Sequence, residues 1–496
     1  MQQLTGVDAT FLYVESPTTF GHVSSLIILD PRDGPVPGFD EIKALYQDRL
    51  HLLTPFRRRL VRVPFDLDHP YWVEDPDLDL DFHIRDTAVA PPGDDRQVAE
   101  LVARLIARPL DRSRPLWELY LIHGLEGGRL GLLTKVHHAA IDGIGGAKLL
   151  ASLLDLAPDA DPPEPEALPD PETVPGEPAM LARGVWSLAT RPYRSGRFLL
   201  KTAGELPQIG QALDVPGRLG RAASSMPQGM LRALGQGERR AEDDPDALDA
   251  ASTTGGIRAP HTRFNGAIGP HRRFAFTSLP LSEVKAVKQA LGVTVNDVVL
   301  GMCAGALRRY LDERGELPET SLRCAIPVSV RDPDEANTFG NKVSVMMASL
   351  ATDVADPVER LRLIGEDTRH AKETFDALPA DLLTDVADFA PPAITARASR
   401  VLMRTIANTT TPPFNLMVSN VPGPQFPLYL AGTEMRHYFP VSAVTDTQAL
   451  NITIQSYNGS CDFGMVACRD AVPDLWDLSD LLATALDELK DAAGIS

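Results

Sequence analysis

The stretch KVHHAAIDG, which runs from Lys135 to Gly143, decides how the rest of the chain is interpreted. It ends an apolar run that predicts a strand, and its terminal glycine permits a turn that other residues resist. On an extended chain His137 and His138 point to opposite faces, so the two imidazoles cannot do the same work. We therefore expect one imidazole to enter a cleft and the other to pack inward, with Asp142 folded back nearby.

A histidine in this position suits general-base chemistry. Its unperturbed pKa of about 6.5 lets the neutral imidazole accept a proton at pH 7. Such a base can deprotonate an alcohol as it attacks an activated acyl carbonyl, with no metal and no covalent enzyme intermediate. The sequence contains no G-x-S-x-G, H-E-x-x-H, phosphate-loop or dinucleotide-binding glycine motif that would indicate another chemistry. A purely structural role for a histidine at a strand end is the alternative.

The residues before this stretch alternate between strand and helix patterns. Apolar spacing and punctuation by proline and glycine predict strands at 22–30, 116–125 and 129–136, and helices at 40–53, 94–107 and 143–156. The two strands at 116–125 and 129–136 flank Glu126-Gly127-Gly128, which predicts a hairpin.

The composition changes sharply in the middle of the chain. Pro158–Pro178 contains eight prolines and seven acidic residues but no Lys or Arg, which is typical of an extended linker. Ala179–Gly235 has the opposite charge, with eight Arg or Lys against two acids. Because Trp, Tyr, Phe and Leu lie among the basic residues of 179–201, this part suits an anionic membrane interface. A crossover helix packed on the folded domains is the alternative.

A folded pattern returns at about Ile257 and continues to the C-terminus. It predicts strands at 272–279, 322–330, 341–351, 415–419, 447–457 and 462–468, and helices at 281–291, 294–313, 357–372 and 475–493. We therefore predict a mixed α/β protein with three parts, namely an N-terminal subdomain at 1–157, a connector at 158–256 and a C-terminal subdomain at 257–496.

Composition and charge exclude several classes of protein. A chain of 496 residues with 44% hydrophobic and 23% charged residues is an ordinary globular protein with length for two domains. The net charge of −19 argues against a nucleic-acid partner. The four cysteines show no C-x-x-C spacing, so we expect no zinc site and no disulfide framework. We see no secretory signal and no window of 18 mainly apolar residues, so a soluble or peripheral protein is expected.

The segment HHAAIDG resembles the HHxxxDG signature of coenzyme-A-dependent acyltransferases, the superfamily of chloramphenicol acetyltransferase and nonribosomal condensation domains. Other segments resemble the bacterial wax ester synthase/diacylglycerol acyltransferase family, and within it the actinobacterial triacylglycerol synthases. These segments are Leu4–Ser16, Phe65–Ile84, Pro115-Leu116-Trp117, Val295–Val299 with Asn296-Asp297, Pro327–Arg331, Gly340-Asn341 and Ser419–Pro424. The resemblance covers almost the whole chain except roughly 158–256.

The resemblance implies two chloramphenicol-acetyltransferase-like subdomains with the active site in a tunnel between them. It implies that His138 is the general base, that His137 supports it, and that Asp142, followed by Gly143, holds the loop, often by pairing with an arginine. Asn296 would donate a hydrogen bond to the oxyanion, although with Asp297 it equally suits the first turn of a helix. Ser419, Asn420 and Gly423 would line the tunnel, with turn chemistry as the alternative. Pro115, Leu116 and Trp117 would pack behind the catalytic strand, and Asp462-Phe463-Gly464 would be structural.

The activity implied by the resemblance is transfer of a long-chain acyl group from acyl-CoA to diacylglycerol, which forms triacylglycerol. The alternatives are wax ester synthesis with a long-chain alcohol, a condensation-like reaction with a carrier-bound donor, and a non-catalytic scaffold on lipid inclusions. No cofactor or metal is expected, since acyl-CoA is a substrate. The expected location is cytoplasmic, peripheral on the inner membrane face or on lipid inclusions.

Overall fold

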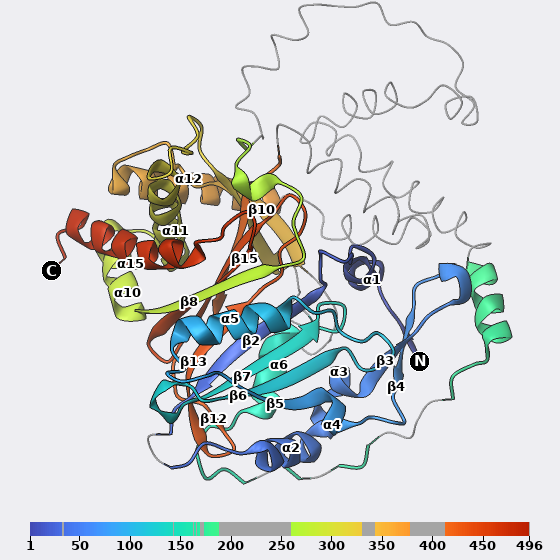
Figure 1. Cartoon of the computed structure of the whole chain (residues 1–496). Helices are drawn as coiled ribbons and strands as arrows, with labels where there is room; N and C mark the ends of the chain where they lie inside the picture. The colour runs from blue at the N-terminus through green and yellow to red at the C-terminus, as the bar shows by residue number, and fades with distance from the viewer. Residues whose placement is uncertain are drawn as a thin grey trace, which may run out of the picture. The chain divides into compact units, whose positions relative to one another are not determined.

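The computed structural model of the chain describes residues 1–31, 34–141, 143–161, 163–164, 166–168, 173–187, 259–329, 343–376 and 412–495. Residues 1–185 and 259–496 form one compact unit, and 186–258 form another, of which only Trp186 and Ser187 are described (Figure 1). All that follows on sheets and sites concerns the first unit.

A six-stranded sheet, here called the N-sheet, carries the histidine pair. Its strand order is β12-β13-β2-β7-β6-β5, and only the β5–β6 pair is parallel. The strands are β2 His22–Leu29, β5 Ile84–Ala88, β6 Trp117–His123, β7 Leu130–His137, β12 Tyr429–Leu430 and β13 Thr433–Val441. The predicted hairpin is confirmed, since β6 and β7 pair antiparallel around the turn at Glu126–Gly128.

A second six-stranded sheet, the C-sheet, has the order β10-β9-β11-β14-β15-β8. Its strands are β8 Arg272–Pro280, β9 Arg323–Ser329, β10 Val343–Ser349, β11 Leu416–Pro422, β14 Leu450–Tyr457 and β15 Ser460–Cys468. The strand β11 pairs parallel with both β9 and β14, and the other pairs are antiparallel. A smaller sheet of β1 Gln2–Gln3, β4 Tyr71–Glu74 and β3 Arg58–Val61 accompanies them.

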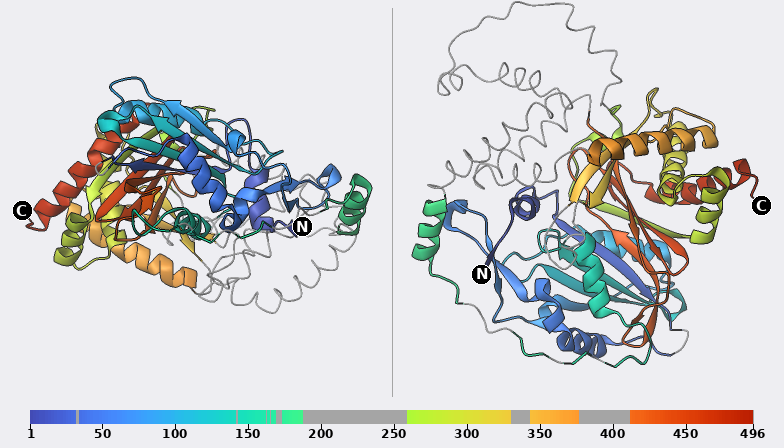
Figure 2. Two further views of the ribbon diagram at one scale, coloured as in Figure 1. Left: turned by 90° about the horizontal axis from the view of Figure 1, so that it is seen from below. Right: turned by 180° about the vertical axis from the view of Figure 1, so that it is seen from behind.

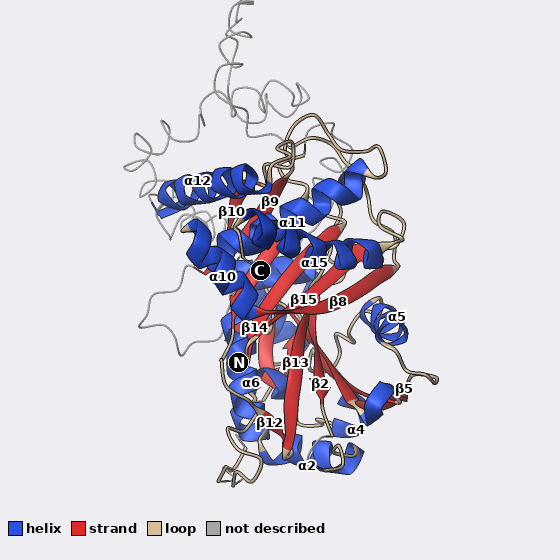
Figure 3. Cartoon of the chain, turned by 90° about the vertical axis from the view of Figure 1, so that its left-hand side faces the viewer, coloured by secondary structure: helices blue, strands red, loops and turns tan. Residues whose placement is uncertain are grey.

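Helices cover the sheets, and their ends follow local capping chemistry. They are α1 Gly6–Tyr13, α2 Phe39–Asp48, α3 Thr54–Arg57, α4 Leu80–His83, α5 Asp95–Ile106, α6 Gly143–Leu153, α10 Leu281–Leu291, α11 Val295–Asp312, α12 Pro357–Asp376 and α15 Leu475–Ala492. The helices α10, α11, α12 and α15 pack together over the C-sheet (Figure 3). Gly292 ends α10 with a φ of 68°, and Thr294 caps α11 by accepting from the Asp297 amide, as the sequence predicts.

The C-terminal half of the chain contributes strands to both sheets. β13, at 433–441, pairs with β2 of the N-sheet, so the sequence boundary at 257 does not separate the two sheets. β13 crosses β15 of the C-sheet, where the buried Asp462 accepts hydrogen bonds from His437 Nδ1 at 3.1 Å and from the Tyr438 amide at 2.8 Å. Gly464 lies directly against the Pro440 carbonyl, where a Cβ would overlap it. The Asp462-Phe463-Gly464 element therefore joins the two sheets.

The connector is described only in part. In the described residues between 158 and 176 there is no helix or strand, as expected for the acidic linker, and a helix covers 177–187. The rest of the basic stretch 179–201 lies outside the described residues. Among the described residues, no single helix has the length and apolarity to cross a membrane, and only the pair α10 and α11, bent by 103°, meets both criteria jointly.

Candidate active site

The last residue of β7, His137, is fixed by its backbone on both sides. It lies opposite His22 in the ladder with β2, and its amide donates to the Leu116 carbonyl at 2.9 Å. Its side chain is buried, with 1% exposed. The following residue, His138, begins the turn, and its amide donates to the Gly21 carbonyl at 2.8 Å. The two histidines therefore sit at the junction of strand and turn, as the sequence predicts.

Both ring nitrogens of His137 lie next to other groups of the protein. Its Nδ1 accepts a hydrogen bond from the Ala139 amide at 3.0 Å, which leaves the proton of the neutral ring on Nε2. That Nε2 lies 3.3 Å from the Oε1 atom of Glu15. His137 thus closes the turn on which His138 lies and is itself oriented by a carboxylate.

Glu15 is the centre of a partly buried polar group behind the turn. Its Oε1 accepts from the Gly21 amide at 2.7 Å, and its Oε2 accepts from Arg112 Nε at 3.0 Å. Burial alone would raise the pKa of Glu15, but the contact with His137 and the charge of Arg112 outweigh it and lower the pKa to about 2. The carboxylate is therefore ionised at neutral pH and places its negative charge 3.3 Å from Nε2 of His137, where it attracts a proton on that nitrogen.

Two residues outside the motif shape the space around the histidines. A Cβ on Gly21 would lie 2.6 Å from His137 Nε2 and 2.8 Å from the Phe11 carbonyl oxygen, so the backbone approaches the ring as only glycine allows. The Phe11 ring stacks on the His138 ring, with centroids 4.1 Å apart and an angle of 6° between the planes. His138 is half-buried, whereas His137 is buried.

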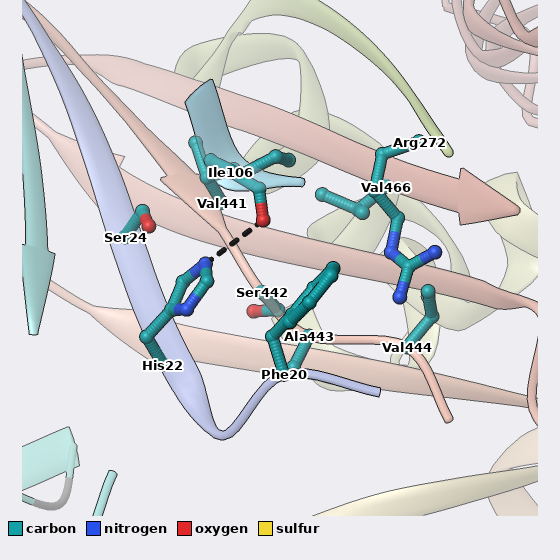
Figure 4. Close-up of a pocket in the computed structure, with 10 residues that line it drawn as sticks. All are labelled: Phe20, His22, Ser24, Ile106, Arg272, Val441, Ser442, Ala443, Val444 and Val466. Atoms are coloured by element: carbon teal, nitrogen blue, oxygen red, sulfur yellow. Dashed lines mark hydrogen bonds between the residues drawn. The ribbon is translucent and has the colours of Figure 1, made fainter. Parts of the chain in front are cut away.

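His22 is a third histidine at this end of the sheet, but its setting marks it as structural. It is buried, and its Nε2 lies 3.0 Å from the Ile106 carbonyl oxygen (Figure 4). Burial, reinforced by the charge of Lys135, lowers the pKa of His22 and keeps the ring neutral. The cavity beside it, bounded by Phe20 and Arg272 among others, has a volume of about 10 Å³, which is room for one water molecule and no substrate.

A buried ion pair stiffens β7 just before the histidines. Lys135 is fully buried, and its Nζ donates to Glu118 Oε2 at 2.9 Å and to the Arg108 carbonyl at 3.0 Å. Tyr120 donates to the same carboxylate oxygen at 2.9 Å. Burial lowers the pKa of Lys135, while Glu118 opposes the shift. The pair ties β7 to β6 and to the end of α5.

The Pro115-Leu116-Trp117 motif lies directly behind the histidine strand. Trp117 is buried between the rings of Phe56 and His83, each 4.4 Å away, and its Nε1 donates to the Phe56 carbonyl at 2.9 Å. Leu116 supplies the carbonyl that accepts from the His137 amide. The structure therefore supports the packing role expected for this motif.

The predicted site residues of the C-terminal half form a separate group. Asn420, in β11, donates through Nδ2 to Asn296 Oδ1 at 3.5 Å, so the two asparagines meet across β11 and the start of α11. Asp297 is structural, because its carboxylate accepts from the Thr294 amide at 2.9 Å and from the Thr368 hydroxyl at 3.2 Å. The Asn296 amide nitrogen is the end of this side chain that can donate to an oxyanion.

The remaining predicted site residues lie in strand, packing or helix-start positions, or outside the described residues. Ser419 and Asn420 are strand residues of β11, not turn residues, and pair with Thr453 and Ile454 of β14. Gly423 lies so close to the Ser456 carbonyl and the Gln455 side chain that a Cβ would overlap both, which gives it a packing role whatever else it does. Gly143 begins α6. Asp142 lies outside the described residues, and so do the strand-end residues 330–342.

Glu15, Arg112, Gly21 and Phe11 were not among the predicted site residues. Each lies far from the histidines in the sequence, and no periodicity marks it. The opening Leu4–Ser16 segment contains Phe11 and Glu15, and its resemblance to the start of a known family was the one available signal.

Solved structures with similar folds define the class of this protein. The first condensation domain of the CDA synthetase matches 99% of this chain and 97% of its own, with a TM-score of 0.53 and 15% identity. A wax ester synthase/diacylglycerol acyltransferase from Marinobacter aquaeolei VT8 matches 100% of both chains, with a TM-score of 0.68 and 29% identity. The fold is therefore the condensation-domain type with two chloramphenicol-acetyltransferase-like parts. The predicted tunnel between them stays a prediction.

The sequence comparisons identify the family. The wax ester synthase/diacylglycerol acyltransferase catalytic domain matches residues 4–299, and the C-terminal domain of the same family matches residues 339–490. Two proteins of Mycobacterium tuberculosis strain H37Rv are 37% and 35% identical, over 99% of this chain and 100% and 91% of their own lengths. Their names assign them diacylglycerol O-acyltransferase activity provisionally. The chain belongs to the wax ester synthase/diacylglycerol acyltransferase family and is an acyltransferase.

Proposed function

We propose that this acyltransferase transfers a long-chain fatty acyl group from acyl-CoA to the free hydroxyl of a diacylglycerol, with His138 as the general base. The names of its mycobacterial relatives support this acceptor. The role of His138 rests on the contacts of its neighbour His137. Nδ1 of His137 accepts from the Ala139 amide and its Nε2 faces Glu15, so His137 is engaged within the protein. Of the two adjacent imidazoles, His138 is the half-buried one on the turn.

The proposed reaction is a direct displacement. His138 takes the proton of the acceptor hydroxyl as its oxygen attacks the thioester carbonyl carbon, and a C–O bond forms. The tetrahedral intermediate collapses with cleavage of the C–S bond, and the protonated His138 returns the proton to the leaving thiolate. The products are triacylglycerol and free CoA. Because the thioester already activates the acyl group, the reaction as proposed requires no cofactor and no metal.

Asn296 is proposed to stabilise the oxyanion of the intermediate. Its Oδ1 accepts from Asn420, which directs the donating Nδ2 group elsewhere. A donor of this kind contributes about 3–4 kcal/mol of transition-state stabilisation in other acyl transferases and hydrolases. Ser419 and Asn420 are proposed to line the substrate path, and Asp142 to hold the histidine loop.

The test measures thiol release from palmitoyl-CoA with dioleoylglycerol and hexadecanol offered separately. Wild type is compared with His138→Ala and with His123→Ala, a matched variant of an exposed histidine paired only with Asp86 among the contacts described. We expect diacylglycerol-dependent release in wild type and His123→Ala, and a loss of at least about 100-fold in His138→Ala. Release with hexadecanol alone would identify a wax ester synthase. A His138→Ala variant as active as wild type would overturn the proposed mechanism, and no release with either acceptor would favour a carrier-bound donor or a scaffold.

A further inference from the structure

The loop between β3 and β4 holds an aromatic ring in water. Phe65 lies in the short 3₁₀ turn Pro64–Asp66 at the tip of this connection and is 81% exposed. Phe65 and Asp66 both adopt left-handed backbone conformations, with φ of 59° and 51°. Residues with a Cβ adopt this conformation rarely and at a cost. A ring this exposed buries little area on folding, so it contributes little to the packing of the fold and is accessible to a partner.

A second apolar surface lies beside this loop. The helix at 177–187 packs against it through Gly184, where a Cβ would lie 2.7 Å from Val63 Cγ1 and 3.0 Å from Leu67 Cβ (Figure 2). Val185, the next residue along the helix, is nevertheless 53% exposed. The loop and the helix thus expose large apolar side chains in neighbouring segments.

A cavity of about 280 Å³ lies beneath the same loop. It reaches from Val63 and Asp66, on either side of the Phe65 turn, to Glu15 and Arg112 behind the histidine pair. Its full lining is Leu12, Tyr13, Glu15, Leu60, Arg62, Val63, Asp66, Asp68, Pro70 and Arg112. The lining carries three acidic side chains against two arginines, which disfavours the phosphates of CoA. Both arginines are paired with lining carboxylates, and the other five lining residues apart from Asp68 are apolar or aromatic, so the cavity offers an uncharged amphiphile both polar and apolar contacts.

We infer that the Phe65 loop and the adjoining face of the helix at 177–185 dock onto a phospholipid bilayer, which brings the cavity next to the lipid that contains the acceptor. Aromatic side chains favour the boundary between headgroups and acyl chains, where one part of the ring is apolar and its surroundings are wet. The exposed Arg62 is paired with Asp66 at 2.9 Å. The helix carries one exposed basic residue, Arg183, and one exposed acidic residue, Glu177, so the surface has little net charge. Insertion of apolar side chains therefore dominates over attraction to anionic headgroups. The identity of the acceptor rests on the proposed function, but the docking does not.

The first test is co-sedimentation of the full chain with dioleoylphosphatidylcholine vesicles, with and without dioleoylglycerol. We expect Phe65→Ser combined with Val185→Ser to weaken partition at least about tenfold. The matched control is Phe426→Ser combined with Leu156→Ser, which removes apolar side chains that are 49% and 73% exposed elsewhere. Wild-type binding should persist at high salt. Equal weakening in the control, or binding lost at high salt, would overturn the inference.

The second test locates the contact directly. The four native cysteines are buried, so Phe65→Cys can be labelled selectively with an environment-sensitive dye. We expect a blue shift of its emission on adding vesicles, and none for the same dye at Phe426→Cys. If the protein binds the vesicles but the emission of the dye at position 65 does not shift, the inference is contradicted. The His138→Ala variant should bind vesicles as wild type does. The vesicle-binding result can therefore be interpreted even if the proposed catalytic function is wrong.

Discussion

The Oε1 atom of Glu15 lies 3.3 Å from Nε2 of His137, and Arg112 holds the other oxygen of the same carboxylate. Glu15 follows α1, His137 ends β7, and Arg112 lies in the segment between α5 and β6. Three distant segments therefore meet at the Glu15 carboxylate, beside the imidazole that closes the HHxxxDG turn. This arrangement makes Glu15 a positioning residue, because it acts on His138 indirectly, through His137 and through Gly21, whose carbonyl accepts from the His138 amide.

Glu15→Gln should lower kcat about 10- to 100-fold with little change in KM for the acceptor. Glutamine keeps an oxygen acceptor but loses the negative charge that orients the His137 ring and pairs with Arg112, so the turn loses part of its pre-organisation. Steady-state thiol release measures both constants. Glu126→Gln, at an exposed turn position, serves as the control and should match wild type. A fall in activity explained wholly by a smaller folded fraction would contradict the positioning role.

The same carboxylate predicts how stability depends on pH. Folding lowers the pKa of Glu15 from 4.5 to about 2, so its contribution to stability is complete above pH 4.5 and is lost as the pH falls towards 2. Urea unfolding at a series of pH values should therefore show a smaller loss of stability between pH 4.5 and 2 in Glu15→Gln than in wild type. Parallel curves for the two proteins would show that the carboxylate is not the group that titrates.

Gly21→Ala should lower the turnover rate strongly while most of the protein stays folded. The new Cβ would lie 2.6 Å from His137 Nε2, so either the ring or the 20–22 backbone must move, and the amide bond to Glu15 shifts with it. We expect a loss of activity of at least about tenfold and a destabilisation of roughly 1–3 kcal/mol. Gly266→Ala is the matched control, since a Cβ there meets nothing within 4 Å and its φ is −88°. Normal turnover in Gly21→Ala would show that the close approach is unimportant.

Local features of the sequence predicted many of the longer elements, because strand alternation, proline breaks and caps act over a few residues, but the short elements α1, β3, β4 and β5 were not predicted. The strands β2 and β7, and the helix α11 with its Thr294 cap, follow from such signals. β13 escaped prediction because a register shift between Met435 and His437 breaks its alternation, and because it leaves the C-sheet to pair with β2. Nothing local shows that a strand changes sheets.

The candidate site also contains local features that the sequence predicts and long-range contacts that it does not. HHxxxDG is contiguous, so its position and the difference between its two histidines could be predicted from the sequence alone. The support for His137 could not be predicted, because Glu15, which contacts His137, is itself held by Arg112, 97 residues further along the chain. The contact between Asn296 and Asn420 likewise joins a helix start to a strand. Such contacts depend on the order of strands in the sheets, which the residue pattern does not encode locally.

Asn296 and Asp297 are neighbours with different roles, so substitutions at them should separate activity from stability. Asn296→Ala should lower kcat about 100-fold with an unchanged unfolding midpoint if its amide stabilises the oxyanion. Asp297→Ala should lower the free energy of unfolding by about 1–2 kcal/mol, since it removes the bonds to Thr294 and Thr368. Kinetics and thermal unfolding of both variants provide the comparison. An Asn296→Ala variant that loses stability but not turnover would return this residue to a purely structural role.

Gly464→Ala should loosen the junction between the two sheets. A Cβ at this position would overlap the Pro440 carbonyl of β13, while Asp462 two residues earlier bonds His437 and the Tyr438 amide of the same strand. We expect a loss of about 2 kcal/mol or more in the free energy of unfolding, and faster hydrogen exchange of the β13 amides. Asp462→Ala should act in the same direction, because it leaves the buried Tyr438 amide without its acceptor. Gly266→Ala is again the control. If Gly464→Ala and Asp462→Ala have the same free energy of unfolding as this control and wild type, the pairing of β13 with β2 is sufficient to hold β13 in place.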